Sequence, residues 1–122
     1  MIKEVVFSEE FNRAFKRLKK RYHSLPDDIK KLLKSLVENP VQGKELYNGL
    51  RKIRLSITSK GKGKRGGGMV IIQVSINATR LAFIYIYDKS DIVNVSDAFL
   101  DQVIVEVGNG KFISMDLPQT EA

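Results

Sequence analysis

Apolar residues at the start of the chain follow the spacing of one strand and then two helices. Residues 2–7 form a short β-branched run that predicts a strand, and Ser8 is suited to cap a following helix. Four residues then recur on one helical face: Phe11, Phe15, Leu18 and Tyr22. A second helix is expected from Pro26, which suits a first turn, to the stop signal Asn39-Pro40. Its apolar face comprises Ile29, Leu32, Leu33, Leu36 and Val37. Together the two predicted helices form a helical hairpin with one apolar side.

Three segments in the middle of the chain predict strands, with loops at 41–48 and 59–68 and a tight turn at 77–79. In the first strand, residues 50–57, one face is apolar: Ile53, Leu55 and Ile57. The other face is polar: Lys52, Arg54 and Ser56. In the second strand, residues 69–76, alternation predicts another shared face: Val70, Ile72, Val74 and Ile76. The third strand, residues 81–87, is apolar on both faces and is therefore expected at the centre of the sheet.

A last helix is predicted from the candidate cap Ser96 to Val107, before Gly108-Asn109-Gly110. Its apolar side comprises Phe99, Leu100, Val103 and Ile104. Residues 111–122 either add a short strand or form a loose tail. We therefore expect a single α+β domain over residues 1–122. It comprises an antiparallel sheet, the N-terminal helical hairpin packed on one face and a short C-terminal helix, with 108–122 as a tail of uncertain structure.

The composition excludes several classes of protein. No apolar run reaches the roughly 18 residues of a membrane span, and the acidic pair Glu9-Glu10 interrupts any signal peptide, so a cytoplasmic protein is expected. The sequence contains no Cys, which removes disulfides, thiolate nucleophiles and Cys-ligated zinc. His23 is the single histidine and cannot form a His-rich site. No metal and no cofactor are therefore expected.

Positive charge is concentrated in the first half of the chain. Residues 1–65 hold 18 Lys/Arg and 7 Asp/Glu, a net of +11, whereas residues 66–122 hold 3 and 7, a net of −4. Residues 51–65 carry seven cations and no acid. Strand alternation places Lys52 and Arg54 on one face, roughly 7 Å apart, a spacing that suits successive phosphates of a nucleic-acid strand. The alternative is an ordinary solvent-exposed sheet face.

The segment 59–68 alternates cations with glycines. Four cations lie in it: Lys60, Lys62 and Lys64, which are candidates for RNA binding, and Arg65. Glycines let backbone N–H groups approach an anion closely. The segment lacks P-loop spacing and does not open a helix, so nucleotide triphosphatase activity is not expected. The alternative is a hairpin tip enriched in Lys for solubility.

Aromatic residues of the third strand are candidates for base stacking. Alternation places Phe83, Tyr85 and Tyr87 on one side, where aromatics beside cations can stack on unpaired bases. Tyr85 is the RNA-binding candidate, with core packing as the alternative, and Tyr87 at the strand end is expected to be exposed. Neither a Ser-His-Asp triad nor a paired-carboxylate site is evident, so RNA cleavage here would depend on Lys, Arg and Tyr. In such chemistry the 2′-hydroxyl attacks the adjacent phosphorus, cations stabilise the phosphoryl charge, and no metal is required.

The order of three motifs resembles a known family. The predicted hairpin is followed by Leu50-Arg51-Lys52-Ile53-Arg54-Leu55, then by GKGKRGG before a strand, then by Tyr87-Asp88-Lys89. Over residues 1–107 this order is similar to the RelE/ParE-type toxins of type II toxin–antitoxin systems, on the RelE/HigB-like branch. The resemblance implies ribosome-dependent cleavage of messenger RNA, inhibition of translation and neutralisation by a cognate antitoxin protein. It leaves the oligomeric state open.

The resemblance also assigns roles to individual residues. It implies that Lys52 accepts the proton of the attacking hydroxyl and that Arg54 clamps the phosphate. Lys89 matches a basic position after the last core strand, Tyr87 is a stacking or acid group, and Arg65 is a loop cation near the same face. The five form the candidate catalytic set.

One position departs from the family pattern. Where the family usually reads Gly-Gly-x-Arg-Val-Ile, this chain reads Gly67-Gly68-Met69-Val70-Ile71. The missing arginine would bind phosphate, so one alternative to the endoribonuclease is a catalytically attenuated, antitoxin-binding protein. A second alternative, which does not depend on this position, is a non-enzymatic inhibitor of DNA gyrase, as in the ParE branch.

Overall fold

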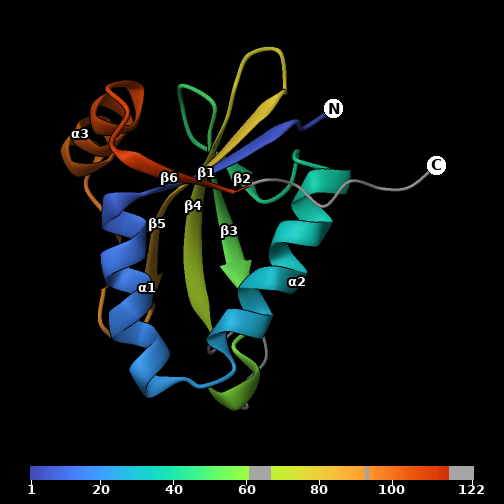
Figure 1. Cartoon of the computed structure of the whole chain (residues 1–122). Helices are drawn as coiled ribbons and strands as arrows, with labels where there is room; N and C mark the ends of the chain where they lie inside the picture. The colour runs from blue at the N-terminus through green and yellow to red at the C-terminus, as the bar shows by residue number, and fades with distance from the viewer. Residues whose placement is uncertain (61–66, 93, 116–122) are drawn as a thin grey trace.

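The protein folds into a six-stranded sheet flanked by helices on both faces (Figure 1). This computed structural model describes residues 1–60, 67–92 and 94–115. Helices and strands follow in this order: β1 (Glu4–Ser8), α1 (Glu9–Arg21), α2 (Leu25–Glu38), β2 (Lys44–Glu45), β3 (Leu50–Leu55), the 3-10 helix η1 (Thr58–Lys60), β4 (Gly68–Val74), β5 (Arg80–Asp88), α3 (Asp97–Gly108) and β6 (Phe112–Met115).

The sheet is mixed, and the prediction of an antiparallel sheet was therefore wrong in one respect. The strand order is β2-β3-β4-β5-β1-β6, and β1 runs parallel to β5 while every other neighbouring pair is antiparallel. Parallel neighbours need a long connection, and everything from α1 to β4 lies between these two strands. One edge strand differs from the prediction, and the other matches one of the two alternatives given for the tail. The predicted loop 41–48 contains the short strand β2, and part of the tail forms β6.

The helical hairpin covers one face of the sheet, as predicted. The Ser8 side chain accepts a hydrogen bond from the Phe11 N–H at 2.9 Å and so caps α1. Pro26 lies in the first turn of α2, and Asn39 ends that helix. Beneath the helices, the Phe7 ring lies 4.9 Å from Phe83 between centroids. The buried core on this side also holds Ile53, Leu55, Ile57, Val70 and Ile72.

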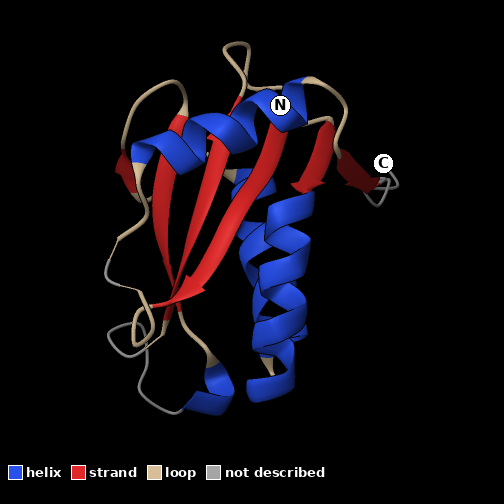
Figure 2. Cartoon of the chain, turned by 90° about the vertical axis from the view of Figure 1, so that its left-hand side faces the viewer, coloured by secondary structure: helices blue, strands red, loops and turns tan. Residues whose placement is uncertain are grey.

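Helix α3 packs on the opposite face, across one end of the strands (Figure 2). Ser96 caps it by accepting a hydrogen bond from the Phe99 N–H at 3.2 Å, as predicted. Its apolar side packs mainly against β1 and β5, through Leu100, Val103 and Val107. In the part of the chain that the structure describes, no helix has the length and apolarity needed to cross a bilayer.

A β-bulge in β5 overturns the predicted placement of its aromatics. Ile71 pairs with Tyr85 but Ile72 pairs with Phe83, so Ile84 is an extra residue without a partner on β4. The bulge reverses the alternation: Phe83 packs in the hairpin-side core, whereas Tyr87 packs in the α3-side core. Ile76 was also misplaced, because β4 ends at Val74 and Ile76 lies fully exposed in the following turn.

A cationic pocket on the α3 side of the sheet

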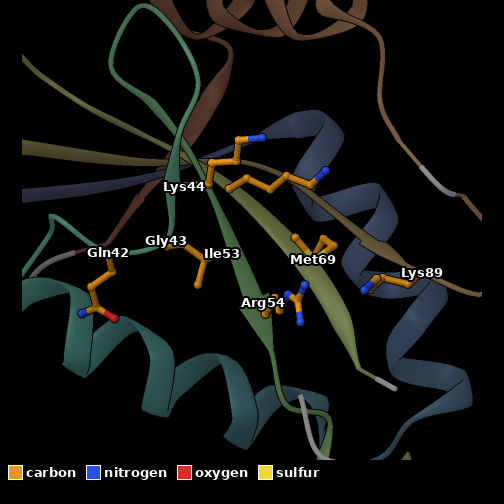
Figure 3. A pocket seen from close by; sticks show the side chains of 8 residues that line it. Gln42, Gly43, Lys44, Ile53, Arg54, Met69 and Lys89 are labelled. Atoms are coloured by element: carbon orange, nitrogen blue, oxygen red, sulfur yellow. The ribbon is translucent and has the colours of Figure 1, made fainter. Parts of the chain in front are cut away.

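An open pocket of about 640 Å³ lies beside β3 on the face that α3 shares (Figure 3). The residues around it are Gln42, Gly43, Lys44, Lys52, Ile53, Arg54, Met69 and Lys89. Four of them are cations, and none is acidic. The pocket therefore concentrates positive charge around an opening wide enough for a small anion or part of a polymer.

Strand alternation brings two of the predicted site residues together. Ile53 and Leu55 point into the hairpin-side core, and this turns Lys52 and Arg54 to the other face, as the sequence predicted. Across the sheet, Lys52 is opposite Ile71 and Arg54 is opposite Met69. Lys89, which follows β5 directly, completes the predicted part of the cluster, and in Figure 3 Met69 lies between Arg54 and Lys89.

Lys44 belongs to the pocket and was missed by the sequence analysis. It lies on β2 directly opposite Lys52 of β3. Gly43, with φ of +74°, is what allows this approach: a Cβ there would be 2.3 Å from the Lys52 carbonyl oxygen. The Arg51 side chain secures the loop by donating from Nε to the Gln42 carbonyl at 2.7 Å. A glycine followed by a lysine, just before an alternating basic strand, is the signal that could have revealed it.

A hydrogen bond to helix α3 holds the turn between β2 and β3. The Tyr47 hydroxyl donates to Asp101 Oδ1 of α3 at 2.7 Å, and this bond raises the pKa of Tyr47 to about 12. The turn that carries Lys44 is thereby tied to the helix that borders the pocket. The placement of Lys44 thus depends on contacts at both ends of its turn.

Lys52 has one polar side-chain partner among the described residues. Its Nζ donates to Asn94 Oδ1 at 3.1 Å, and Asn94 precedes α3. Lys52 also borders a second, smaller hollow of about 130 Å³ against the start of α3. Within residues 1–60, 67–92 and 94–115, no carboxylate forms an ion pair with Lys44, Lys52, Arg54 or Lys89. Asp97 borders this smaller hollow without pairing with a lysine, and four clustered cations that lack an ion-pair partner favour the binding of an anion.

Met69 and Tyr87 form an apolar row beside Arg54. Met69 pairs with Arg54 on one side and with Tyr87 on the other, and both Met69 and Tyr87 are buried. The prediction that Tyr87 is exposed for stacking was wrong, because the bulge turns its ring into the α3-side core. Its hydroxyl is buried and has no hydrogen-bond partner among the described residues, and burial raises the pKa of Tyr87.

Tyr85 is half-buried beneath α3. Its ring lies 4.9 Å from that of Phe99, edge to face. Of the two alternatives that the sequence left open for Tyr85, core packing is the one with an observed contact. Three other candidates, Lys62, Lys64 and Arg65, lie outside the described residues.

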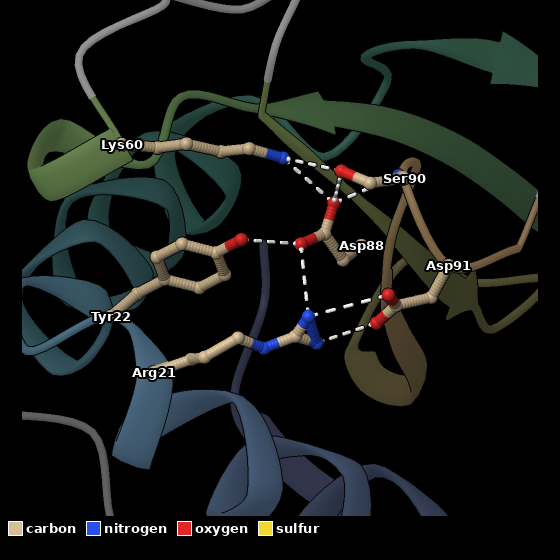
Figure 4. A network of polar contacts seen from close by, with 6 residues as sticks. All are labelled: Arg21, Tyr22, Lys60, Asp88, Ser90 and Asp91. Carbon is tan, nitrogen blue, oxygen red and sulfur yellow. Dashed lines mark hydrogen bonds and ion pairs between the residues drawn. The ribbon is translucent and has the colours of Figure 1, made fainter.

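Lys60 is directed away from the pocket, toward a buried carboxylate (Figure 4). Its Nζ donates to Asp88 Oδ1 at 2.7 Å, and the Tyr22 hydroxyl donates to Asp88 Oδ2 at 2.6 Å. Burial alone would raise the pKa of Asp88, but the hydrogen bonds from Lys60, Tyr22 and Ser90 outweigh it and hold that pKa well below its usual range. The Lys60 ammonium is therefore paired with Asp88 and does not line the pocket, and its predicted role in RNA binding gains no support from its position.

The described residues show no metal site, and sequence comparison assigns no family. In the described part of the chain, no three His, Asp or Glu side chains are grouped so as to hold a metal ion. A scan against protein-family models finds no match to this chain, and a search of curated proteins finds no similar one.

Proposed function

We propose that this protein is the toxin of a type II toxin–antitoxin pair, a metal-independent endoribonuclease that cleaves messenger RNA on the ribosome. The observation that carries the proposal is the cationic pocket, in which Lys44, Lys52, Arg54 and Lys89 surround one opening and none of them forms an ion pair with a described residue. A phosphodiester supplies a negative charge for them to bind. The order of motifs shared with RelE/HigB-like toxins supports the same substrate class.

The proposed reaction is an internal transfer at phosphorus. The ribose 2′-oxygen forms a bond to the adjacent phosphorus while the 5′-oxygen of the next nucleotide leaves, giving a 2′,3′-cyclic phosphate and a free 5′-hydroxyl. The 2′-hydroxyl proton passes to a base, for which the neutral amine form of Lys52 is the proposed acceptor, so that Lys52 becomes the ammonium, and a proton reaches the leaving oxygen from solvent. Arg54 stabilises the charge on the phosphoryl oxygens, because a guanidinium remains protonated and can bind two of them.

A second candidate function rests on Met69. Its buried thioether lies beside Arg54 at the position where the family resemblance places an arginine. A pocket with one fewer phosphate-binding group would bind RNA but cleave it slowly. The chain would then act as an attenuated, antitoxin-binding protein. The substitution Met69→Arg distinguishes the active endoribonuclease from the attenuated protein. Faster cleavage by the variant indicates that the native protein is attenuated. If the native protein already cleaves RNA and the variant cleaves it at the same rate, the native protein is not attenuated.

The proposed antitoxin is an acidic protein segment that covers the pocket. Its carboxylates would supply the counter-charge that the RNA otherwise supplies, so the same four cations would bind either partner, but not both at once. In this proposal the antitoxin neutralises the toxin by competing with RNA for the same four cations.

Cleavage in a translating extract tests the function. We expect primer extension on messenger RNA to show new 5′ ends with the native protein and none with Lys52→Ala or Arg54→Ala. Lys3→Ala, an exposed lysine outside the pocket, is the matched control and should leave cleavage unchanged. If the pocket variants cleave as well as the native protein, the assignment is wrong. Intact messenger RNA together with a DNA-damage response would instead indicate the gyrase inhibitor.

A further inference from the structure

The outer surface of the helical hairpin carries a second set of cations, on the face of the sheet opposite the pocket. Seven exposed lysines and arginines lie on α1 and α2: Lys16, Arg17, Lys19, Lys20, Lys30, Lys31 and Lys34. We call these seven residues the hairpin cations. The pocket cations point to the α3 side, whereas the hairpin packs on the other core, so the two surfaces are separated by the sheet (Figures 1 and 2).

The hairpin cations lack counter-charges within the part of the chain that the structure describes. The acids at the start of α1, Glu9 and Glu10, pair with Arg13, and Arg21 pairs with Asp91 and Asp88. None of the seven forms an ion pair or a side-chain hydrogen bond with a described residue. No acid lies between residues 11 and 26. Helix α2 does carry the acids Asp27, Asp28 and Glu38, but none of them forms an ion pair with a described lysine or arginine, so an external polyanion would meet cations without an ion-pair partner on both helices.

The rest of the hairpin surface indicates which polyanion fits. The large apolar side chains exposed among the described residues are Met1, Val41, Ile76, Val105, Ile113 and Met115, and none of these lies on α1 or α2. A protein interface of ordinary affinity has an apolar core, and an amphipathic helix that binds a membrane inserts apolar side chains. The hairpin aromatics, such as Phe11 and Phe15, belong to the core, so the described surface of α1 and α2 offers no exposed ring on which unpaired bases could stack.

We propose that the hairpin cations form a second nucleic-acid site, which binds the phosphate backbone of double-stranded RNA. A duplex keeps its bases stacked inside and carries its phosphates along the outside, which matches a surface of cations without apolar or aromatic contacts. Lys16 and Lys20 are one helical turn apart, about 6 Å along α1, close to the spacing of neighbouring phosphates. Because the pocket is on the other face, a single strand and a duplex can be bound together. This site does not depend on cleavage.

Binding of a short RNA duplex over a range of salt concentrations tests the proposal. The double variant Lys16→Gln/Lys20→Gln is compared with Lys3→Gln/Lys111→Gln, which removes two exposed charges elsewhere. By fluorescence anisotropy with a duplex of about 16 base pairs, we expect the hairpin variant to lower the slope of log K against log salt by about two. The matched control should leave that slope unchanged.

Each other outcome overturns the proposal. Equal loss in both double variants would show that net charge, and not the hairpin, governs binding. An unchanged slope in the hairpin variant would exclude a duplex contact at these lysines. Vesicles of phosphatidylserine and phosphatidylcholine serve as a competing probe, and hairpin-dependent binding to them without binding to the duplex would indicate a membrane surface. Since Lys52→Ala is expected to weaken single-strand binding alone, failure of this proposal and failure of the nuclease assignment are distinguishable.

Discussion

Two groups of cations lie near the end of β5, and they differ in what balances their charge. Around Asp88, Lys60 and Arg21 face a buried carboxylate within 2.7 and 3.7 Å. In the pocket, Lys52, Arg54 and their neighbours form no ion pair with a described carboxylate; Asp97 borders the smaller hollow beside Lys44 and Lys52 without pairing with either. The first group joins α1, η1 and the end of β5, whereas the second borders an opening. Paired and buried charge indicates a structural role here, and clustered, unpaired and accessible charge indicates a binding role.

The largest expected effect follows from removing the buried carboxylate. Asp88→Asn leaves Lys60 without its counter-charge and weakens the bond from Tyr22, so we expect the free energy of unfolding to fall by about 3 kcal/mol. Urea denaturation measures it. Asp91→Asn is the matched control: its side chain is 47% exposed, and its loss should cost less than about 1 kcal/mol. Equal effects of the two substitutions would contradict the structural role of the Asp88 network.

Acid should remove the same stabilisation. Because the pKa of Asp88 is lower in the folded protein than the ordinary 3.8, folding favours its ionised form. Its contribution is complete above the ordinary value and is lost as the pH falls below about 4. The difference in unfolding free energy between the native protein and Asp88→Asn should therefore shrink as the pH is lowered from neutral to acidic. A difference that stays constant over this range would show that the charge of Asp88 contributes nothing.

The pocket cations should show the opposite behaviour. Lys52→Ala or Arg54→Ala relieves repulsion among like charges, so the free energy of unfolding should stay within about 0.5 kcal/mol of the native value or rise slightly. Added salt should shrink any rise, because it screens exposed charges. Thermal or urea denaturation at low and moderate ionic strength measures this. A loss comparable to that of Asp88→Asn would remove the contrast between the two groups.

Local sequence signals predicted the parts of the fold that depend on local physics. The caps at Ser8 and Ser96 and the break at Asn39 are set by neighbouring residues alone, and the structure confirms all three. The shared face of Lys52 and Arg54 follows from a strand that is half buried. The folded protein keeps these features, because a tertiary contact that changed them would have to oppose both the local conformational preference and the burial of the apolar side chains.

Long-range features were not readable from the sequence. The parallel insertion of β1 beside β5 is decided by the packing of whole elements, since an isolated apolar strand carries no sign of its direction. The bulge at Ile84 has no glycine to mark it, yet it reverses the faces of Tyr85 and Tyr87. Nothing in the sequence separates Lys60 from the other basic residues of its loop, because its partner Asp88 is 28 positions away in the chain. Strand alternation therefore predicted the pocket residues Lys52 and Arg54. Lys44 was missed, because its position depends on the pairing of β2 with β3.

The smallest expected effect is that of removing the hydroxyl of Tyr87, a residue of β5 that is close in sequence to the pocket residue Lys89. Tyr87 immediately precedes Asp88, but its hydroxyl is buried without a hydrogen-bond partner among the described residues. Tyr87→Phe removes this unsatisfied group, so the free energy of unfolding should be unchanged or rise by up to about 1 kcal/mol, and messenger RNA cleavage should persist. Denaturation and primer extension measure the two. A stability loss would mean that the hydroxyl is hydrogen-bonded, and a cleavage loss at native stability would restore the acid role that the family resemblance implies for Tyr87. If neither occurs, proton transfer to the leaving oxygen does not need this residue, and the chemistry of the pocket rests on its cations.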